Sequence, residues 1–366
     1  MPLRALDAPP AQRPHTTRVM PERIVPSARK PVFVAPPPES SVVAASPPSF
    51  SVIIPAYDAA AFVAEAVKSA LGQTLAPHEV IVCDDGSTDD LAGAVAPYRQ
   101  HVVLLHKEHG GLASARNAAV GIASGDFVAF LDADNVYLPE NLQAVSELAA
   151  ARPDLDIVTT DAYLELDGEI YGRYYRGKAR FVADDQRRGI IHQHFIFGNG
   201  AIRREALLAV GGYDETVVAE DTDLFVRMIL GGSRVGLVDE PLCVYRIRPG
   251  SLSSSRPRGL RAAVEVLERV RDHPSLSSSE RQYLERELAG KRREAALAEA
   301  EAALRGLMPD PRRRCLRIAF GGRGYGVRSR VRALAGAIAP RLAGGYLNAL
   351  ERRTGKSRLA SRTHGR

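Results

Sequence analysis

The sequence predicts an α/β fold with a mostly parallel sheet covered by helices on both faces. Four short apolar runs, at residues 51–54, 80–83, 102–105 and 127–131, alternate with segments whose apolar residues recur at helical spacing. Short apolar runs bounded by turn residues are typical of fully buried strands, and their alternation with helices indicates parallel βαβ units. Polar residues follow these runs, at the sheet edge where open α/β sheets bind ligands.

Each run is followed by a recognisable turn or helix. Pro55 ends the first run, and apolar residues then recur at helical spacing up to Leu71, with Asp58 as a plausible N-cap. An Asp-Asp-Gly-Ser turn follows the second run, and a Gly-Gly turn with a helical segment at 112–123 follows the third. Asp-Ala-Asp-Asn follows the fourth run, and an amphipathic helix is expected near residues 223–230.

Composition excludes several classes of protein. The chain has 366 residues, enough for about two domains, and is 45% hydrophobic and 25% charged, which excludes a wholly disordered, fibrous or disulfide-scaffold protein. Its three cysteines lie far apart without a CxxC pair, so neither a disulfide framework nor a cysteine zinc site is supported. No continuous apolar segment suits secretion or a membrane span, so we expect a cytoplasmic protein.

Changes in composition divide the chain into four parts. Residues 1–49 hold 12 of the 24 prolines without lasting periodicity, which predicts a disordered leader. The α/β pattern occupies residues 50–258, and an Ala- and Glu/Arg-rich helical extension follows at 259–308. A basic tail, which includes a strand-like run at 316–320, occupies residues 309–366.

The net charge of +6 hides an asymmetry. Residues 310–366 hold 15 Lys and Arg against 2 Asp and Glu, a local charge of +13, whereas the rest of the chain carries −7. Four apolar residues recur in this tail at near-helical spacing among arginines: Val327, Val331, Leu334 and Ile338. A basic amphipathic segment can lie on the anionic inner membrane surface, and a solvated charge run is the alternative. Aromatic residues do not alternate with the basic ones, so nucleic acid is not an expected partner.

The segments after the first two runs have the groups that a nucleotide requires. An aromatic ring can stack on a base, and carboxylates can accept hydrogen bonds from base N–H groups and ribose hydroxyls. Tyr57, Asp58 and Asp85 supply such groups. The alternative is that Asp-Asp-Gly-Ser at 84–87 only caps the next helix, because Asp and Ser are favoured N-caps.

Asp132 and Asp134 follow the fourth run and are separated by one small residue. Two such carboxylates can hold a divalent cation beside a diphosphate, because Mg²⁺ usually binds one or two carboxylates plus phosphate oxygens. The ion would stabilise charge on a departing phosphate. The alternative is an Asp-rich turn before the helix expected at Pro139.

Two further segments contain candidate functional residues. The Gly-Gly turn leads into a helix whose N-terminus favours anions, and Arg116, one turn inside, can reach a phosphate or a base carbonyl. Glu220 and Asp221 begin an amphipathic helix, and a carboxylate held in a cleft can act as a general base on a hydroxyl. The alternatives are a surface arginine and a carboxylate pair that is solvated or stabilises a helix N-terminus.

Together these four segments, in this order, resemble the family 2 glycosyltransferases, an inverting family with the GT-A fold. The resemblance covers residues 51–253 and rests on the whole set of motifs: Ile-Pro-Ala-Tyr, Asp-Asp-Gly-Ser-Thr-Asp, Gly-Leu-Ala-Ser-Ala-Arg-Asn, Leu-Asp-Ala-Asp, Glu-Asp-x-Asp-Leu, and Tyr-Arg followed by Gly250 and Ser251. It implies a binding site for the base and ribose of a nucleotide-sugar donor, formed by Pro55, Tyr57, Asp58, Asp84 and Asp85.

The resemblance also implies roles for the residues nearer the diphosphate. Arg116 would lie near the base or the diphosphate, and Asp132 would contact the ribose or the metal. Asp134 would be the main protein ligand of Mg²⁺ or Mn²⁺. Many relatives have Asp where this chain has Asn135, and a metal-contacting His where it has Arg248. Either the ion has one protein ligand fewer, or Arg248 contacts the diphosphate of the donor.

The implied function is transfer of a sugar, with inversion, from a donor such as a UDP-hexose to a hydroxyl of a saccharide or lipid-linked acceptor, in polysaccharide or glycolipid synthesis. Asp221 would be the catalytic base, with Glu220 and His194 on the acceptor side. His192 and His194 are an alternative metal-ligand pair, because residues two apart share a face of a strand. A non-catalytic nucleotide-sugar-binding or scaffolding protein is the other hypothesis, which retention of Asp134 and Asp221 disfavours.

Overall fold

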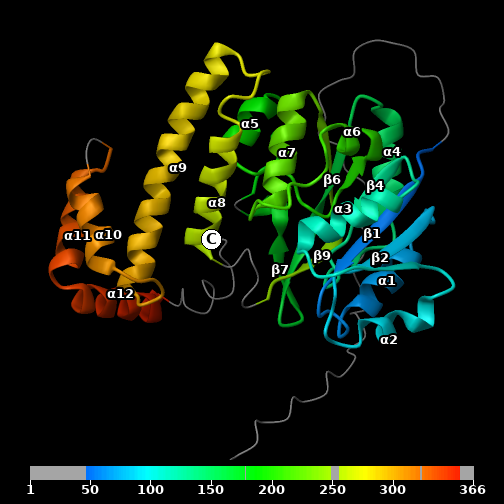
Figure 1. Ribbon diagram of the computed structural model, residues 1–366, viewed down its shortest axis with the longest axis horizontal. Coiled ribbons are helices and arrows are strands. Elements are labelled where there is room, and N and C mark those ends of the chain that lie inside the picture. Colours follow the sequence, from blue (N-terminus) through cyan, green and yellow to red (C-terminus); the bar gives the residue numbers. More distant parts are fainter. Residues whose placement is uncertain (1–46, 178, 249–254, 322–323, 355–366) are drawn as a thin grey trace, which may run out of the picture. The chain divides into compact units, whose positions relative to one another are not determined.

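A computed structural model describes residues 47–177, 179–248, 255–321 and 324–354, with side chains up to residue 350 (Figure 1). The leader predicted at residues 1–49 therefore lies almost entirely outside the described residues, as do Gly250 and Ser251. Among the described helices, none is both long and apolar enough to cross a bilayer.

The four predicted apolar runs form the parallel half of a nine-stranded sheet. They correspond to β1 (Phe50–Ala56), β2 (Glu79–Asp84), β3 (Val103–His106) and β4 (Phe127–Phe130). The strands lie in the order β3-β2-β1-β4, and all neighbouring pairs are parallel. Ile53 lies opposite both Ile81 and Phe130, so the carboxyl ends of these strands meet at one edge. The predicted strands and fold class are confirmed.

The other half of the sheet mixes parallel and antiparallel strands. It consists of β5 (Val136–Tyr137), β6 (Ile157–Leu166), β7 (Glu169–Arg173), β8 (Ala201–Arg203) and β9 (Val235–Arg246). The order continues β4-β8-β6-β9-β5, with β7 paired to β6 as a hairpin. The β6–β9 register shifts on both sides of Asp161. Such irregularities interrupt the alternation of side chains, which is why the sequence indicated only short strands here.

Alternate residues of the strands face two separate cores. Ile53, Ile81 and Phe130 face a core that is completed by α3 (Leu112–Ile122), α5 (Gln186–His192), α6 (Arg204–Ala209), α7 (Glu220–Gly231), α8 (Arg256–Arg269) and α9 (Ser278–Leu304). Val52 and Ile54 face the other core, which is completed by α1 (Val63–Leu71), α2 (Leu91–Val95) and α4 (Asn141–Ala151). Two short 3₁₀ turns lie at Ala96–Tyr98 and Tyr174–Arg176. The helices therefore cover both faces of the sheet, as the apolar strands require.

A third, smaller core forms among the C-terminal helices. It joins α9 to α10 (Pro311–Phe320) and α11 (Val327–Ile338), and α12 (Pro340–Thr354) follows. The strand-like interpretation of residues 316–320 is wrong, because Pro311 begins a helix there and Cys315 and Ile318, one turn apart, pack into this core. Asp58 does not cap α1 as predicted, since α1 begins at Val63 without a side-chain cap.

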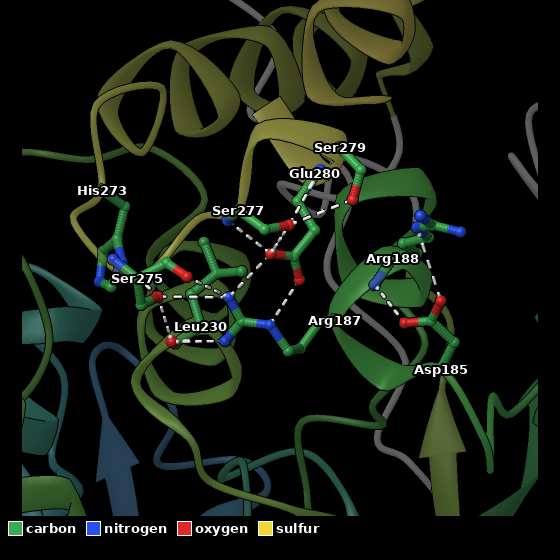
Figure 2. Close-up of polar contacts among 9 residues, drawn as sticks. All are labelled: Asp185, Arg187, Arg188, Leu230, His273, Ser275, Ser277, Ser279 and Glu280. Carbon is green, nitrogen blue, oxygen red and sulfur yellow. Dashed lines mark hydrogen bonds and ion pairs between the residues drawn. The ribbon is translucent and has the colours of Figure 1, made fainter. Parts of the chain in front are cut away.

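A cluster around Arg187 attaches α9 to the α/β domain (Figure 2). From α5, Arg187 donates through Nε to Glu280 Oε1 at 2.6 Å and through Nη1 to the Leu230 carbonyl of α7 at 2.7 Å. Its Nη2 donates to the Ser275 carbonyl at 2.9 Å. One guanidinium thus links three helices and the turn between α8 and α9.

Glu280 also closes the N-terminus of α9. The Glu280 backbone N–H donates to Ser277 Oγ at 3.2 Å, and the Ser277 backbone N–H donates to Glu280 Oε2 at 2.8 Å. This reciprocal pair is a capping box. Hydrogen bonds from Arg187 lower the pKa of Glu280 to about 2. The carboxylate therefore stays ionised at neutral and moderately acidic pH.

Replacing Arg187 with Gln should lower the free energy of unfolding by about 2 to 4 kcal/mol, because Glu280 and two carbonyls lose a charged donor. The difference in free energy of unfolding between wild type and variant should become smaller in acid. Folding lowers the pKa of Glu280, so its contribution is complete above the ordinary carboxyl pKa and is lost as the pH falls toward about 2. Urea unfolding of wild type and variant at about pH 7 and about pH 3.5 measures both effects.

Arg188→Gln is the matched control, because the neighbouring Arg188 pairs with Asp185 at 3.6 Å with both side chains about half exposed. It should change the free energy of unfolding by no more than about 0.5 kcal/mol. Equal losses in the two variants would show that Arg187 does not anchor α9.

Candidate active site

A cavity of about 820 Å³ lies at the carboxyl ends of β1 and β4. The start of α7, the end of β9 and one face of α8 complete its walls. Ten of the twelve predicted site residues line it: Pro55, Tyr57, Asp58, Arg116, Asp132, Asp134, His194, Glu220, Asp221 and Arg248. The sheet topology thus brings together residues that are far apart in sequence, at the edge that parallel strands use for ligands.

Tyr57 forms an aromatic platform at one end of the cavity. It is 46% exposed, and its ring centroid lies 4.1 Å from that of His109. Asp58, beside it, accepts a hydrogen bond from the Thr88 backbone N–H at 2.7 Å, which lowers the pKa of Asp58. An open aromatic face beside an ionised carboxylate suits the base and ribose of a nucleotide.

Asp85 lies behind this platform, not in the cavity. It is 1% exposed, and its carboxylate accepts from Lys107 Nζ at 2.7 Å and from the backbone N–H groups of Gly110 and Gly111 at 3.0 and 2.7 Å. Burial works to raise the pKa of Asp85, but these hydrogen bonds outweigh it and lower the pKa. Asp85 therefore holds the loop that leads into α3, and contact with a nucleotide would displace these partners.

Asp84 has a similar local role. It accepts from the Ser87 backbone N–H at 2.9 Å and lies 2.8 Å from the His106 ring nitrogen. Gly86 has a φ of 74°, and a Cβ there would lie 2.8 Å from the His109 backbone nitrogen. The segment 84–87 therefore builds a tight turn, whereas α2 is capped by Asp90.

Sequence reasoning missed Lys107 and His109. Lys107 neutralises Asp85, and the His109 ring packs on Tyr57 and lies 2.9 Å from Asp85 Oδ2. Their position directly before the Gly-Gly turn was the only available signal. Spacing alone did not connect these residues with Tyr57, which follows a different strand, β1.

Arg116 is the buried cation of the site. It is 5% exposed, and it donates through Nη1 to Glu220 Oε1 at 3.0 Å and through Nη2 to Asp132 Oδ1 at 3.1 Å. Its guanidinium also lies 5.2 Å from the ring centroid of Tyr213. Burial would lower the pKa of Arg116, but the surrounding negative charges outweigh burial and raise it. Arg116 therefore joins the end of β4 to the start of α7 as a permanent cation.

Asp132 and Asp134 lie directly after β4. Asp132 Oδ2 accepts weakly from the Asn135 side-chain Nδ2 at 3.3 Å, while the Asn135 side-chain Oδ1 accepts from the Arg246 backbone N–H at 3.0 Å. An Asp at position 135 could not donate to Asp132, so the amide suits this place. Burial, and then the charge of Asp132, raise the pKa of Asp134. A bound cation would relieve this repulsion.

Arg248 lies next to Asp134, with its Nε 3.4 Å from Asp134 Oδ2. Its guanidinium carbon is 3.4 Å from the ring centroid of Phe62, so the side chain is held by a cation–π contact. Its buried Nη2 has no hydrogen-bond partner among the described residues. Arg248 thus supplies a donor and a positive charge beside the Asp132–Asp134 pair.

Asp221 and Glu220 begin α7 and have different environments. Burial and the neighbouring charge of Asp221 raise the pKa of Glu220. Burial also opposes ionisation of Asp221, but the charges of His194 and Arg116 outweigh it and lower the pKa of Asp221. Asp221 is therefore the carboxylate that stays ionised, as a general base must before it accepts a proton.

His194 is held against Asp221. Its Nε2 lies 4.0 Å from Asp221 Oδ2, and its Nδ1 lies 3.1 Å from Thr222 Oγ1. The Thr222 backbone N–H donates to Asp221 Oδ1 at 2.6 Å. Oδ2 is therefore the Asp221 oxygen that remains available to a ligand, with His194 beside it.

His192 does not join His194 as a metal-ligand pair. His192 ends α5, and its Nδ1 lies 3.0 Å from Glu287 Oε2 of α9. The predicted pairing assumed that residues 192–194 form a strand, in which side chains two residues apart share a face. His192 instead ends a helix, so this geometry does not apply. His192 is also absent from the residues that line the cavity.

The family model of glycosyl transferase family 2 matches residues 51–211. The matched region, 161 of the 366 residues, has the sequence pattern of family 2 glycosyltransferases. The match includes β1 to β4 with their polar turns, and the remaining part of the cavity comes from α7, β9 and α8.

A named relative matches much of the same region. The chain is 29% identical over 217 residues to a hyaluronan synthase of Pasteurella multocida, a match that covers 57% of this chain and 21% of that protein. The chain thus spans about a fifth of the length of this relative.

Two solved glycosyltransferase structures share its fold. S. aureus TarS 1–349, in complex with UDP-GlcNAc, superposes with a TM-score of 0.53 at 20% identity, covering 84% of this chain and 92% of that one. The mannosyltransferase PcManGT from Pyrobaculum calidifontis, in complex with GDP-Man and Mn²⁺, superposes with a TM-score of 0.53 at 22% identity. This match covers 88% of this chain and 91% of that one. These likenesses confirm the GT-A type of fold.

Replacing Arg116 with Gln should lower the free energy of unfolding by about 3 kcal/mol or more, because Glu220 and Asp132 lose their buried counter-charge. Adding Glu220→Gln to that variant should recover part of the loss. Urea unfolding at neutral pH measures both changes. Arg234→Gln, which removes a pair with Asp154 at 2.9 Å in a more exposed place, is the control and should cost at most about 1 kcal/mol. A loss no larger than that control would contradict the bridging role of Arg116.

Proposed function

We propose that the chain is an inverting, metal-dependent glycosyltransferase that moves a sugar from a nucleotide-sugar donor to an acceptor hydroxyl. One observation carries the proposal: Asp221, the ionised carboxylate, lines the same cavity as Asp132, Asp134 and the Tyr57 platform. A base, a phosphate-binding pair and a nucleotide platform thus face a common space.

The proposed reaction is a single displacement. Asp221 Oδ2 takes the proton of the acceptor hydroxyl, and the acceptor oxygen forms a bond to the anomeric carbon of the sugar. The bond from that carbon to the diphosphate breaks on the opposite side, which inverts the anomeric centre. The nucleoside diphosphate leaves with the electron pair. His194, 4.0 Å from Asp221 Oδ2, favours the ionised carboxylate before transfer.

The residues present fit a divalent cation shared with the donor. Asp132 and Asp134 line the cavity, where burial and then the charge of Asp132 raise the pKa of Asp134. Among the described residues, no group of three or more His, Cys, Asp and Glu side chains could hold a metal ion. Asp134 and Asp132 would therefore hold Mg²⁺ or Mn²⁺ together with phosphate oxygens. When bound, the ion supplies positive charge for the departing diphosphate.

Arg248 and Arg116 have distinct tasks in this proposal. Arg248 has an unpartnered Nη2 beside Asp134, which makes it a donor for the diphosphate. Arg116 has two carboxylate partners already, so it orients Asp132 and Glu220 and acts on the diphosphate by its field. Arg116 is in this sense a positioning residue.

The class of substrate follows from the platform and from the relatives. The TarS and PcManGT structures contain UDP-GlcNAc and GDP-Man respectively. We take a UDP-linked hexose as the donor, because the Tyr57 platform and Asp58 offer stacking and a single carboxylate to the base. The acceptor would be a saccharide or a lipid-linked saccharide in polysaccharide or glycolipid synthesis, which accords with the relative named hyaluronan synthase.

A non-catalytic protein that binds nucleotide sugars is the second candidate. Such a protein could keep Tyr57 and Asp134 but would have no use for an ionised carboxylate at position 221. Release of a nucleoside diphosphate from sugar nucleotides, in the presence of a mixture of saccharide acceptors, distinguishes the two candidates. Binding without release would favour the second.

Asp221→Asn should lower kcat by about 10²- to 10⁴-fold, because the amide cannot accept the acceptor proton. The KM for the donor should change little. Because the pKa of Asp221 is lowered, wild-type kcat should stay level through neutral pH and fall only in acid. Asp184→Asn, at an exposed position, is the matched control and should retain wild-type kcat. A kcat within a few-fold of wild type for Asp221→Asn would rule out its role as base.

Thermal unfolding with UDP or GDP, with and without Mn²⁺, tests the donor and metal sites. One diphosphate should raise the Tm much more when Mn²⁺ is present, and at about 100 times its Kd should stabilise by about 2.7 kcal/mol. The Asp134→Asn variant should lose the part of the Tm increase that depends on Mn²⁺, and the Asp184→Asn variant should keep it. An increase that is equal with and without Mn²⁺ in the wild type would contradict metal dependence.

A further inference from the structure

Exposed large hydrophobic side chains are concentrated in the C-terminal helices. Of the 19 such residues on the described surface, ten lie between residues 307 and 350. Helix α10 packs against α9 and α11, and α12 packs against α9 and α11 (Figure 1). The small core around Cys315 and Ile318 holds the buried residues of α10 and α11, so the exposed apolar residues of these two helices belong to other faces.

α11 has the clearest pattern. Val327, Val331, Leu334 and Ile338 follow one another at spacings of four, three and four residues, which places them in one stripe along the helix. Val327 is 78% exposed and Ile338 is 71% exposed. The helix packs inward through the small residues Ala333, Gly336 and Ala337 instead. The apolar stripe is therefore directed away from the fold.

The neighbouring helices continue this arrangement. On α12, Leu342 and Tyr346 are 78% and 67% exposed and lie one turn apart. On α10, Leu316 and Phe320 are exposed and likewise lie one turn apart. Three successive helices thus each present large apolar side chains to the surroundings.

A groove of about 660 Å³ lies between the start of α10, the end of α11 and the start of α12. It is lined by basic side chains from the start of α10 and by the α11–α12 junction, including Arg312, Arg313, Arg341, Ile338 and Leu342. Asp310 is the one acidic residue among those that line it. Arginines and aliphatic side chains therefore meet in the same depression.

Most arginines on the described part of these helices lack internal partners, although Arg314 pairs with Glu299 and Arg330 donates to the Tyr325 carbonyl. Within the described part of the chain, six of them form neither a hydrogen bond nor an ion pair: Arg312, Arg313, Arg317, Arg328, Arg332 and Arg341. Arg328 and Arg332 lie next to the α11 stripe, one turn apart. The positive charge is thus available to an external anionic surface.

We propose that α10, α11 and α12 form a docking surface for an anionic phospholipid bilayer. Val327, Val331 and Ile338 would enter the boundary between headgroups and acyl chains, while the flanking arginines contact lipid phosphates. The groove at Arg312 and Arg341 would receive a headgroup. This inference goes beyond the proposed glycosyl transfer and does not depend on it.

The charge pattern selects a membrane over other occupants. A second copy of this chain would bring like-charged arginine clusters together, which opposes association through this face. Nucleic acid would leave the aliphatic stripe exposed, because aliphatic side chains neither pair with phosphates nor stack on bases as aromatic ones do. An anionic bilayer surface satisfies both the apolar stripe and the arginines.

Sedimentation of the full chain with vesicles tests the proposal. The wild type should sediment with phosphatidylcholine vesicles that contain phosphatidylglycerol and remain in solution with phosphatidylcholine alone. High salt should release it, because salt screens the arginines. Sedimentation with neither vesicle, or equally with both, would overturn the proposal.

Two paired variants separate the apolar and the ionic contributions. Val331→Ser with Ile338→Ser should weaken partitioning at least about tenfold. Arg312→Gln with Arg341→Gln should weaken it about 30-fold, at about fivefold for each arginine. Ile170→Ser, and Arg99→Gln with Arg180→Gln, make equivalent changes at exposed positions elsewhere and should leave partitioning unchanged.

Circular dichroism and sedimentation velocity complete the test. All variants should keep the wild-type Tm, since the altered side chains are exposed. A loss of partitioning that follows a loss of Tm would count against the proposal, as would equal effects of the control variants. A wild-type dimer that the Val331→Ser, Ile338→Ser variant converts to a monomer would assign the surface to a second copy instead.

Discussion

The whole site depends on one buried guanidinium. Arg116 comes from α3, yet its two carboxylate partners come from the end of β4 and the start of α7, at 3.1 and 3.0 Å. A buried arginine needs such partners, because removing its charge from water is costly. Because Asp132 and Glu220 both accept hydrogen bonds from Arg116, the two carboxylates are fixed relative to each other. Asp221, the next residue along α7, is thereby brought to the cavity that Asp132 and Asp134 line.

The arginines of the cavity and those of the C-terminal helices form two separate groups. Arg116 is nearly inaccessible and Arg248 is held on Phe62, so both act within the cavity. The arginines of α10 to α12 lie on separate helices beyond α9, and six lack partners in the described structure. The net charge of +6 therefore describes no single surface. We therefore assign the proposed phosphate chemistry to the cavity and the proposed membrane attachment to the C-terminal helices.

Sequence alone predicted the parallel half of the fold and ten of the cavity residues, because buried strands and their polar turns leave local patterns. Asp84 and Asp85 show the limit: the pattern identified carboxylates, but only the fold reveals that Lys107 and two glycine N–H groups already occupy Asp85. Long-range contacts, such as Arg116 with Glu220, have no local signature. The C-terminal half of α10 was mistaken for a strand because a short, mostly apolar segment such as Leu-Arg-Ile-Ala-Phe fits either structure.

Arg116 is the proposed scaffold for the two carboxylates, Asp132 and Glu220. A crystal structure of the chain with a nucleotide sugar and Mn²⁺ tests this most directly. We expect the base on Tyr57, the diphosphate between Asp134 and Arg248, the anomeric carbon facing Asp221, and Arg116 still bound to Glu220 and Asp132. Release of Arg116 from Glu220 to bind the diphosphate, with Asp221 turned away from the sugar, would contradict it.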